Sequence, residues 1–423
     1  MITQWPGPEQ QVTFVNQSTS AAKSTFTIQN LKQNYSVGEE LLVTIFAKDF
    51  TGRPKFYGGD FFQAKVHSST LKASVFGEVV DHHNGTYSAH FLLPWAGQAS
   101  VAVLLVHSSE VILALKQHWS TDTCQVLYKG FFVSETFANG SRAEETALCT
   151  IKWPGAVLPG TGDMDQSNCC CEYRDGRTGV GRSICRPRMP TPVPAGFYFK
   201  DVWTSFVCAT RHFRGKDKAA CLRNKHIHMV GDSTTRQWYF YLVKDTPTLK
   251  ALDLHSLWNA GPHMAVDVQN NIDLHWRTHG LPYRTPRTKM SSLQYIENLI
   301  DQLDGGPQTV LVFTMWAHYT SFPLSYFVHR VSLVRRAVTS LLRRAPQTKV
   351  IIKSANTASM VTWAGLMATF LIDRVVREAF HDVGVYFLDV WQMTSCHYLR
   401  YDIHPQEVIV KNEVDILLSF ICT

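Results

Sequence analysis

The chain has 423 residues, of which 45% are hydrophobic and 18% charged, and this composition excludes a largely disordered protein. The length suits two or three domains, and no stretch approaches the roughly 18 apolar residues of a membrane-spanning helix. The net charge of +7 is concentrated around residues 149–221, among cysteines and prolines, so it indicates no nucleic-acid partner and is compatible with acidic substrates.

Residues 1–23 are expected to form a flexible N-terminus, and residues 24–125 contain short β-forming runs separated by turn residues. The clearest runs are Leu41–Ala47, Phe61–Val66, Thr86–Phe91 and Ala99–Val106. Roughly seven such strands predict an antiparallel β-sandwich of the immunoglobulin or filamin type. Since it carries no catalytic constellation, we expect a recognition or packing module.

Glycosylation acceptor sequences occur in the first third of the chain, at Asn16, Asn34, Asn84 and Asn139. The chain also has ten cysteines, three of them consecutive at Cys169–Cys171. Together these features indicate a disulfide-bonded glycoprotein of the secretory route. The opening residues, MITQWPGPEQ, lack the basic and apolar regions of a signal peptide, so a missing upstream signal or anchor is expected.

Residues 126–221 are rich in cysteine and proline and predict a connector stapled by disulfides. A zinc site is the alternative, but paired C-x-x-C spacings are absent and no histidine follows at ligand distance, so we expect no metal. Cys422 is expected to bond to a cysteine of this connector or to Cys396.

Residues 222–423 alternate apolar strands with longer helical patterns, which predicts a three-layer α/β domain around a parallel sheet. The predicted strands are His226–Val230, Thr309–Thr314, Val350–Lys353 and Val385–Leu388. A helix is expected before Pro346, with Arg330 on its solvent side. Two further helices are expected over residues 366–380 and 407–422. Apart from a strand at Asp273–Trp276, most of residues 247–289 is expected to form loops over the site.

Two residues of this domain have the types and places that acyl chemistry needs. Ser233 follows a strand and opens a helix, where its hydroxyl lies at the carboxyl edge of the sheet and free N–H groups can stabilise an oxyanion. His404 lies in the loop before the last helix and is a candidate base for that serine, with Asp402 or Asp389 as the orienting acid. The structural alternatives are helix capping by Ser233 and a capping role for His404 beside Pro405.

Both halves of the chain resemble known domains. Segments that resemble the PC-esterase branch of the GDSL/SGNH hydrolases are Gly231–Arg236, Phe313–Tyr319 and Asp402–Pro405. Segments that resemble a neurexophilin-like, filamin-type domain are Tyr35–Leu41, Tyr57–Asp60 and Asn84–Tyr87. In this order the two domains resemble the neurexophilin and PC-esterase domain family over about residues 20–423.

The resemblance implies that Ser233 is the nucleophile and His404 the base. The family's acid lies three residues before the histidine, where this chain has Tyr401, and Asp402 stands one position closer. The identity of the acid therefore stays open at this point.

A second departure concerns the oxyanion hole, because Trp316–Tyr319 replaces the Gly-x-Asn-Asp block of ordinary SGNH enzymes. His318 is a candidate donor from the asparagine's place, with a buried structural histidine as the alternative. Asp232 and Arg236 are assigned to the same oxyanion and substrate-binding set. Arg236, one helical turn after the serine, is expected either to bind a substrate carboxylate or charged donor or to form a salt bridge.

By this resemblance, the leading prediction is a glycan O-acetyltransferase of the Golgi lumen or secretory route. Acetyl would pass from acetyl-CoA through an acetyl-Ser233 intermediate to a glycan acceptor such as sialic acid on a glycoprotein. One alternative is a carbohydrate O-acetyl esterase, since the same serine can pass its acetyl to water. The other is an inactive α/β scaffold whose β-sandwich is a secreted binding module.

Overall fold

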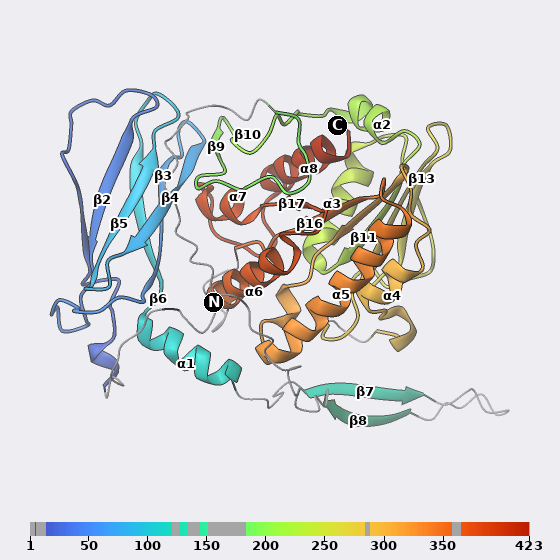
Figure 1. The fold of residues 1–423 in the computed structure, drawn as a ribbon, viewed down its shortest axis with the longest axis horizontal. Coiled ribbons are helices and arrows are strands. Elements are labelled where there is room, and N and C mark those ends of the chain that lie inside the picture. Colours follow the sequence, from blue (N-terminus) through green and yellow to red (C-terminus); the bar gives the residue numbers. More distant parts are fainter. Residues whose placement is uncertain are drawn as a thin grey trace.

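The structure is a computed structural model that describes residue 5 and residues 14–120, 127–133, 144–150, 183–283, 288–357 and 365–422. Its N-terminal strands and its α/β domain lie side by side (Figure 1). No helix in these ranges is long and apolar enough to cross a membrane. The predicted acceptor Asn139 and the cysteines Cys169–Cys171 lie outside the described residues.

The N-terminal β-domain is built from antiparallel strands in the order β1-β2-β5-β4-β3-β6. Their bounds are β1 Thr25–Ile28, β2 Glu40–Phe46, β3 Phe61–Ser68, β4 Ala73–Asp81, β5 Thr86–Leu92 and β6 Ser100–His107. A short 3-10 helix, Val15–Gln17, precedes them and α1, Ser109–Ser120, follows. The antiparallel strands that the alternating pattern predicts are thus present.

Strand β4 links the two halves of this domain. Its first residues pair with β3 and its last residues pair with β5, and the inward side chains of both halves form one core. The change of partner occurs at Gly77, where an added Cβ would lie 2.2 Å from the Phe91 ring. Glycine is required there because the two halves come this close.

The connector is more structured than its composition indicates. Its described residues include two antiparallel strand pairs, β7 Leu127–Val133 with β8 Glu144–Thr150 and β9 Gly196–Phe199 with β10 Val202–Ser205. Strand β9 also pairs with β4, so the connector extends the N-terminal sheet. One predicted feature is confirmed: the connector cysteine Cys221 is bonded to Cys422. A second disulfide joins Cys185 to Cys208, and Cys396 is buried and free.

The C-terminal domain contains a seven-stranded sheet in the order β12-β13-β14-β11-β15-β16-β17. The strand bounds are β11 His226–Gly231, β12 Lys250–Leu252, β13 His263–Asp267, β14 Ile272–Thr278, β15 Thr309–Phe313, β16 Lys349–Lys353 and β17 Tyr386–Leu388. The five strands from β14 to β17 in this order run parallel, but β12 and β13 are antiparallel. The predicted parallel sheet is therefore mixed, because the short connections at β12 and β13 form hairpins and cannot cross over. The strand predicted at Asp273–Trp276 is part of β14, but β12 and β13 lie where loops were predicted.

Helices cover both faces of this sheet, as predicted for a three-layer domain. Their bounds are α2 Gly215–Leu222, α3 Ser233–Asp245, α4 Ile296–Asp301, α5 Leu324–Arg344, α6 Gly365–Phe380, α7 Trp391–Cys396 and α8 Glu407–Ile421, with 3-10 helices at Met290–Ser292 and Ala317–Tyr319. Along β15, Val310 and Val312 pack in the core beneath α3 and α8, whereas Leu311 and Phe313 pack beneath α5 and α6.

One predicted surface residue is buried instead. Arg330 of α5 donates to both carboxylate oxygens of Glu297, at 2.6 and 2.8 Å, and lies over the Tyr295 ring at 3.7 Å. The helix predicted before Pro346 is α5, but the ion pair with Glu297 of α4 draws Arg330 inward.

Candidate active site

Ser233 is the first residue of α3, and Asp232 alone separates it from the carboxyl end of β11. The turn between them is tight because Gly231 lies against the next strand. A Cβ on Gly231 would lie 2.6 Å from Thr314 Cγ2 and 2.8 Å from Thr235 Oγ1. The chain can therefore deliver the serine to the edge of the sheet only with glycine at this place.

The structure brings Ser233 and His404 together. The serine hydroxyl lies 2.6 Å from His404 Nε2, a distance at which it can donate its proton to the ring. The loop that carries His404 is held to the rest of the domain by two backbone contacts. Asn356 Nδ2 donates to the Ile403 carbonyl at 3.0 Å, and Gln237 Nε2 donates to the Pro405 carbonyl at 3.3 Å.

The orienting acid is where the prediction and the geometry differ. Asp402 Oδ1 accepts a hydrogen bond from the backbone N–H of His404 at 2.9 Å. This is an Asx turn, in which the carboxylate binds the backbone two residues later. Asp389 forms an ion pair with Arg377 at 3.1 Å and accepts the Trp391 N–H at 2.9 Å. Across the described ranges, no carboxylate hydrogen-bonds the His404 ring. Within the described ranges, the site is therefore a serine–histidine dyad with no carboxylate on the imidazole.

The N-cap of α3 is Asp232, and not Ser233 as in the capping alternative considered from the sequence. It is fully buried and accepts from the Thr234 N–H at 2.8 Å and the Thr234 hydroxyl at 2.7 Å. Burial raises the pKa of this carboxyl, but His318, Lys353 and the bond to Thr234 outweigh burial and lower it below its ordinary value. Asp232 is therefore an anion that orders the start of α3.

His318 belongs to a ring cluster on the Asp232 side of the site. It lies in the 3-10 helix Ala317–Tyr319, with its ring centroid 5.4 Å from that of His279 and 4.6 Å from that of Tyr283. His279 is buried, with Nδ1 bonded to the Gly280 carbonyl at 2.6 Å, and burial lowers its pKa. No group of three or more potential metal ligands occurs among the residues that the structure describes.

A cavity of about 590 Å³ opens beside the dyad, and both Ser233 and His404 line it. The other lining residues are Arg236, Gln237, Phe240, Tyr241, Lys244, Trp258, Pro405, Glu407 and Val410. Sequence reasoning missed all of these except Arg236. Helical spacing held a signal, because Gln237, Phe240 and Lys244 follow Ser233 by 4, 7 and 11 residues on one face of α3.

Arg236 forms the cationic wall of this cavity. Its Nη1 donates to the Asn259 carbonyl at 2.6 Å, and its guanidinium lies over the Trp258 ring at 4.4 Å and the Trp276 ring at 5.5 Å. It forms no ion pair with a carboxylate in the described ranges, so the predicted salt bridge is not the arrangement seen. Trp258 remains 64% exposed and stacks on Phe240, with ring centroids 5.6 Å apart.

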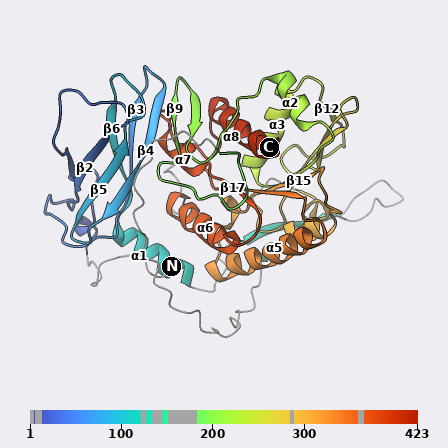
Figure 2. The same cartoon turned by 45° about the horizontal axis from the view of Figure 1, so that its top comes forward.

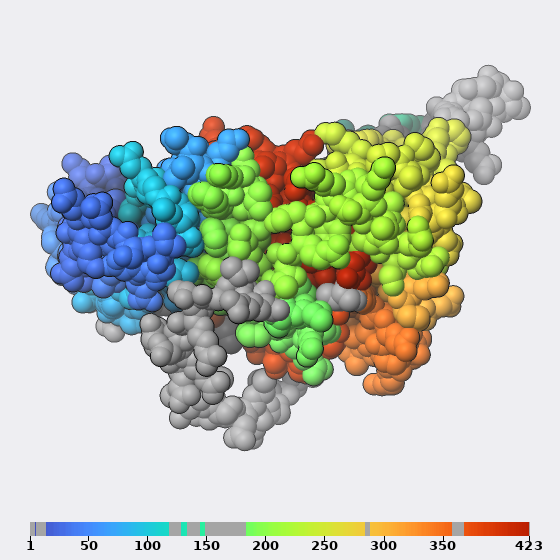
Figure 3. Space-filling model, turned by 90° about the horizontal axis from the view of Figure 1, so that it is seen from above, coloured from blue at the N-terminus to red at the C-terminus, as the bar shows by residue number. Residues whose placement is uncertain are grey.

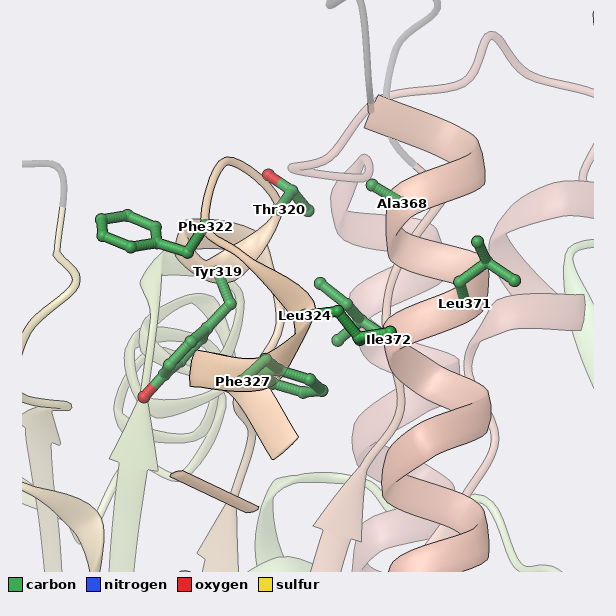
Figure 4. Close-up of a pocket in the computed structure, with 8 residues that line it drawn as sticks. All are labelled: Tyr319, Thr320, Phe322, Leu324, Phe327, Ala368, Leu371 and Ile372. Carbon is green, nitrogen blue, oxygen red and sulfur yellow. The ribbon is translucent and has the colours of Figure 1, made fainter. Parts of the chain in front are cut away.

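A second pocket, between residues 319–327 and α6, is small and apolar (Figure 4). Its volume of about 10 Å³ accommodates at most one water molecule. The larger cavity is therefore the one whose size and lining suit a substrate.

The geometry defines a class: an α/β domain with a serine–histidine dyad at the start of a helix, a constellation able to transfer acyl groups. A family model described as "NXPE family member 4-like, C-terminal domain" matches residues 203–422, and one described as "Neurexophilin" matches residues 8–155. The first match alone spans more than half of the chain. The chain belongs to the NXPE family.

Three solved structures show weak similarity. Phospholipase A1 from Streptomyces albidoflavus NA297 is 10% identical over 39% of this chain and 79% of that chain, with a TM-score of 0.20. An active-site mutant of a family two carbohydrate esterase from Clostridium thermocellum is 11% identical over 90% of both chains, with a TM-score of 0.27. A family two carbohydrate esterase from Cellvibrio japonicus is 10% identical over 94% of this chain and 98% of that chain, also with 0.27. At these scores the likeness establishes no shared activity.

Proposed function

We propose that this protein is a glycan O-acetyltransferase that works through an acetyl-serine intermediate. The observation that carries the proposal is the 2.6 Å contact between Ser233 Oγ and His404 Nε2 at the wall of a cavity. A serine hydroxyl becomes a nucleophile when a neighbouring imidazole accepts its proton.

In the first half-reaction, His404 Nε2 accepts the Ser233 proton while Oγ attacks the acetyl carbonyl of acetyl-CoA. The carbon–sulfur bond breaks, and the leaving thiolate takes the proton from the imidazolium. In the second half-reaction, His404 accepts the proton of a sugar hydroxyl whose oxygen attacks the acetyl-serine. Ser233 leaves and regains its proton, so the dyad returns to its starting state.

The start of α3 supplies donors for the oxyanion of both steps. The first four N–H groups of a helix lack intrahelical acceptors, and Thr234 N–H already donates to Asp232. The Ser233 N–H belongs to the same turn and lies at the positive end of the helix dipole. We assign the oxyanion site to this helix start, with His318 as the second donor candidate.

An anionic sugar suits the cavity, because Arg236 places in its wall a cation that forms no ion pair with a carboxylate in the described ranges. The exposed face of Trp258 offers an apolar surface for a sugar ring. A sialic acid on a glycoprotein combines a carboxylate with hydroxyls that can be acetylated, and we assign it as the acceptor. Lys244, at the same cavity, is a second cation, and the phosphates of acetyl-CoA would have to displace its ion pair with Glu407 at 2.7 Å.

Features outside the site support the secretory route, in the Golgi lumen or after secretion. Three predicted acceptors, Asn16, Asn34 and Asn84, are exposed on the N-terminal β-domain. The Thr86 hydroxyl of one acceptor sequence donates to Asn84 Oδ1 at 2.7 Å. Two disulfides also suit an oxidising compartment.

An O-acetyl esterase is the second candidate, and the exposure of His404 favours it. Ser233 is half-buried, but the imidazole is exposed, so water reaches the base that would activate it. Hydrolysis and transfer then differ only in whether water or a sugar hydroxyl attacks the acetyl-serine.

The test incubates purified full-length protein with acetyl-CoA and a sialylated glycan, read by mass spectrometry, with the desialylated glycan in parallel. We expect one acetyl group to be added to the sialylated glycan only, no addition with Ser233→Ala, and normal addition with Ser332→Ala, an exposed serine on α5. Arg236→Gln should raise the KM for the sialylated acceptor. Loss of acetyl from a pre-acetylated glycan would instead support the esterase, and identical behaviour of Ser233→Ala and wild type would refute the serine mechanism.

A further inference from the structure

The segment that leads to His404 lies between the two domains. It runs from the end of α7 at Cys396 to His404, and α7 lies beside β4 and β9 in both ribbon views (Figures 1 and 2). In the space-filling view, the blue N-terminal β-domain lies directly against the green β9–β10 hairpin (Figure 3). Residues more than 300 positions apart in the sequence therefore meet at this segment.

Lys65 of β3 makes the central contact. Its Nζ donates to the His397 carbonyl at 2.6 Å and lies 4.9 Å from the centre of the Tyr401 ring. The side chain is half-buried, and in the described part of the protein it forms no ion pair with a carboxylate. Burying a cation without a carboxylate partner is unfavourable unless other groups replace the lost water. For Lys65 these groups are the His397 carbonyl and the Tyr401 ring, which both belong to the segment before His404.

A second contact ties the same segment to the N-terminal β-domain through Asp201, in the β9–β10 turn. One Asp201 oxygen accepts from Lys72 Nζ at 2.8 Å, and the other accepts from the Tyr398 hydroxyl at 2.8 Å. The Asp201 carbonyl accepts from Asn412 Nδ2 of α8 at 2.8 Å. The buried His397 ring packs edge-on against Tyr198 of β9, with ring centroids 4.5 Å apart.

These contacts matter because no carboxylate orients the His404 ring in the described ranges. The place of the imidazole then depends on where its backbone is held. The α/β domain holds the far end of the segment through Ile403 and Pro405, whereas the near end is held by Lys65 and Asp201.

We propose that Lys65 is a positioning residue for His404, and that the N-terminal β-domain is thereby a working part of the active site. The effect on catalysis rests on the proposed serine mechanism, but the effect on the segment does not.

The test compares Lys65→Met with Lys65→Arg and with Lys23→Met, which replaces an exposed lysine of the same domain. Hydrogen exchange followed by mass spectrometry measures the amides of residues 397–404 in the full-length protein. Losing a hydrogen bond from a charged donor should make them exchange about tenfold faster in Lys65→Met. Lys65→Arg keeps a cation that can reach the carbonyl and stack on Tyr401, so it should restore slow exchange, and Lys23→Met should match wild type.

A second readout is the rate at which a fluorophosphonate labels Ser233, together with kcat and KM for acetyl transfer. Labelling and kcat should fall about tenfold in Lys65→Met with KM unchanged, since the cavity wall is untouched. Tyr398→Phe, which removes the bond to Asp201, should act in the same direction.

Unchanged exchange of residues 397–404 in Lys65→Met would overturn the proposal. So would an equal increase throughout β11 and β15, because Lys65 would then only stabilise the fold. If wild type is neither labelled nor active, the proposed function fails, while the exchange data still decide whether Lys65 holds the segment.

Discussion

Replacing Gly231 by alanine tests whether the serine is delivered by a close approach between β11 and β15. The new methyl group would lie 2.6 Å from Thr314 Cγ2 and 2.8 Å from Thr235 Oγ1. Neither neighbour can turn away freely. Thr314 Oγ1 donates to the Lys353 carbonyl at 3.0 Å, and Thr235 Oγ1 donates to the Asp232 carbonyl at 3.0 Å.

Overpacking of a close-packed site costs about 1–3 kcal/mol, and two restrained contacts place Gly231→Ala near the upper end. The lower chain entropy of alanine in the unfolded state offsets about 0.4–1 kcal/mol of this. We therefore expect the free energy of unfolding to fall by about 2 kcal/mol, measured by denaturant titration. Labelling of Ser233 by a fluorophosphonate should slow as well, because the start of α3 must shift.

Gly384→Ala is the matched control, since an added Cβ there meets no atom within 4 Å and the glycine has no positive φ. It should leave stability unchanged or slightly raised. Adding Thr314→Ser to Gly231→Ala removes the nearer clashing methyl, keeps the hydroxyl, and should recover about half of the lost stability. A Gly231→Ala protein as stable as Gly384→Ala, or one that Thr314→Ser does not rescue, would refute this account of the turn.

Three further changes test other parts of the fold. Replacing both Cys221 and Cys422 by serine should lower the free energy of unfolding by about 5 kcal/mol, since their disulfide closes a loop between residues 201 positions apart. The thermal midpoint with and without reductant measures this loss, and equal midpoints would contradict the prediction. Burial, with help from neighbouring histidines, lowers the pKa of His228 from 6.5 to about 4, so the unfolded chain binds its proton first as the pH falls. Wild type should lose up to about 3 kcal/mol between pH 6.5 and 4 through this residue, and His228→Phe should lose less in denaturant titrations across that window. Trp238→Phe removes an N–H that donates to the buried Glu413 at 2.6 Å, and should cost about 2 kcal/mol of unfolding free energy; a stability equal to wild type would show that the bond contributes nothing.

Local sequence patterns were enough to locate the elements that carry the dyad. The apolar run at residues 226–230 and the helix after it predicted a strand–turn–helix around Ser233, and β11 and α3 have these places. The last helix was predicted over residues 407–422 and is α8, Glu407–Ile421. Such predictions succeed because alternation and helical spacing depend on neighbours within one or two turns.

Other features depended on contacts between distant segments. The sequence predicted loops over most of residues 247–289, but β13 forms there because it pairs with β14, and β12 forms because it pairs with β13. Likewise, Arg330 was placed on the surface by its helical position, and Glu297 of another helix draws it inward.

For the site, the sequence by itself determined that Ser233 and His404 would lie at the ends of elements in one α/β domain. Only the tertiary structure decided that their side chains meet at 2.6 Å, that Asp402 is used by the backbone, and that Lys65 of the other domain holds the segment before the histidine. The physical reason is that a residue's place on a strand or helix follows from its near neighbours, whereas the partner of a polar side chain is chosen among groups that only the folded chain brings within hydrogen-bonding distance.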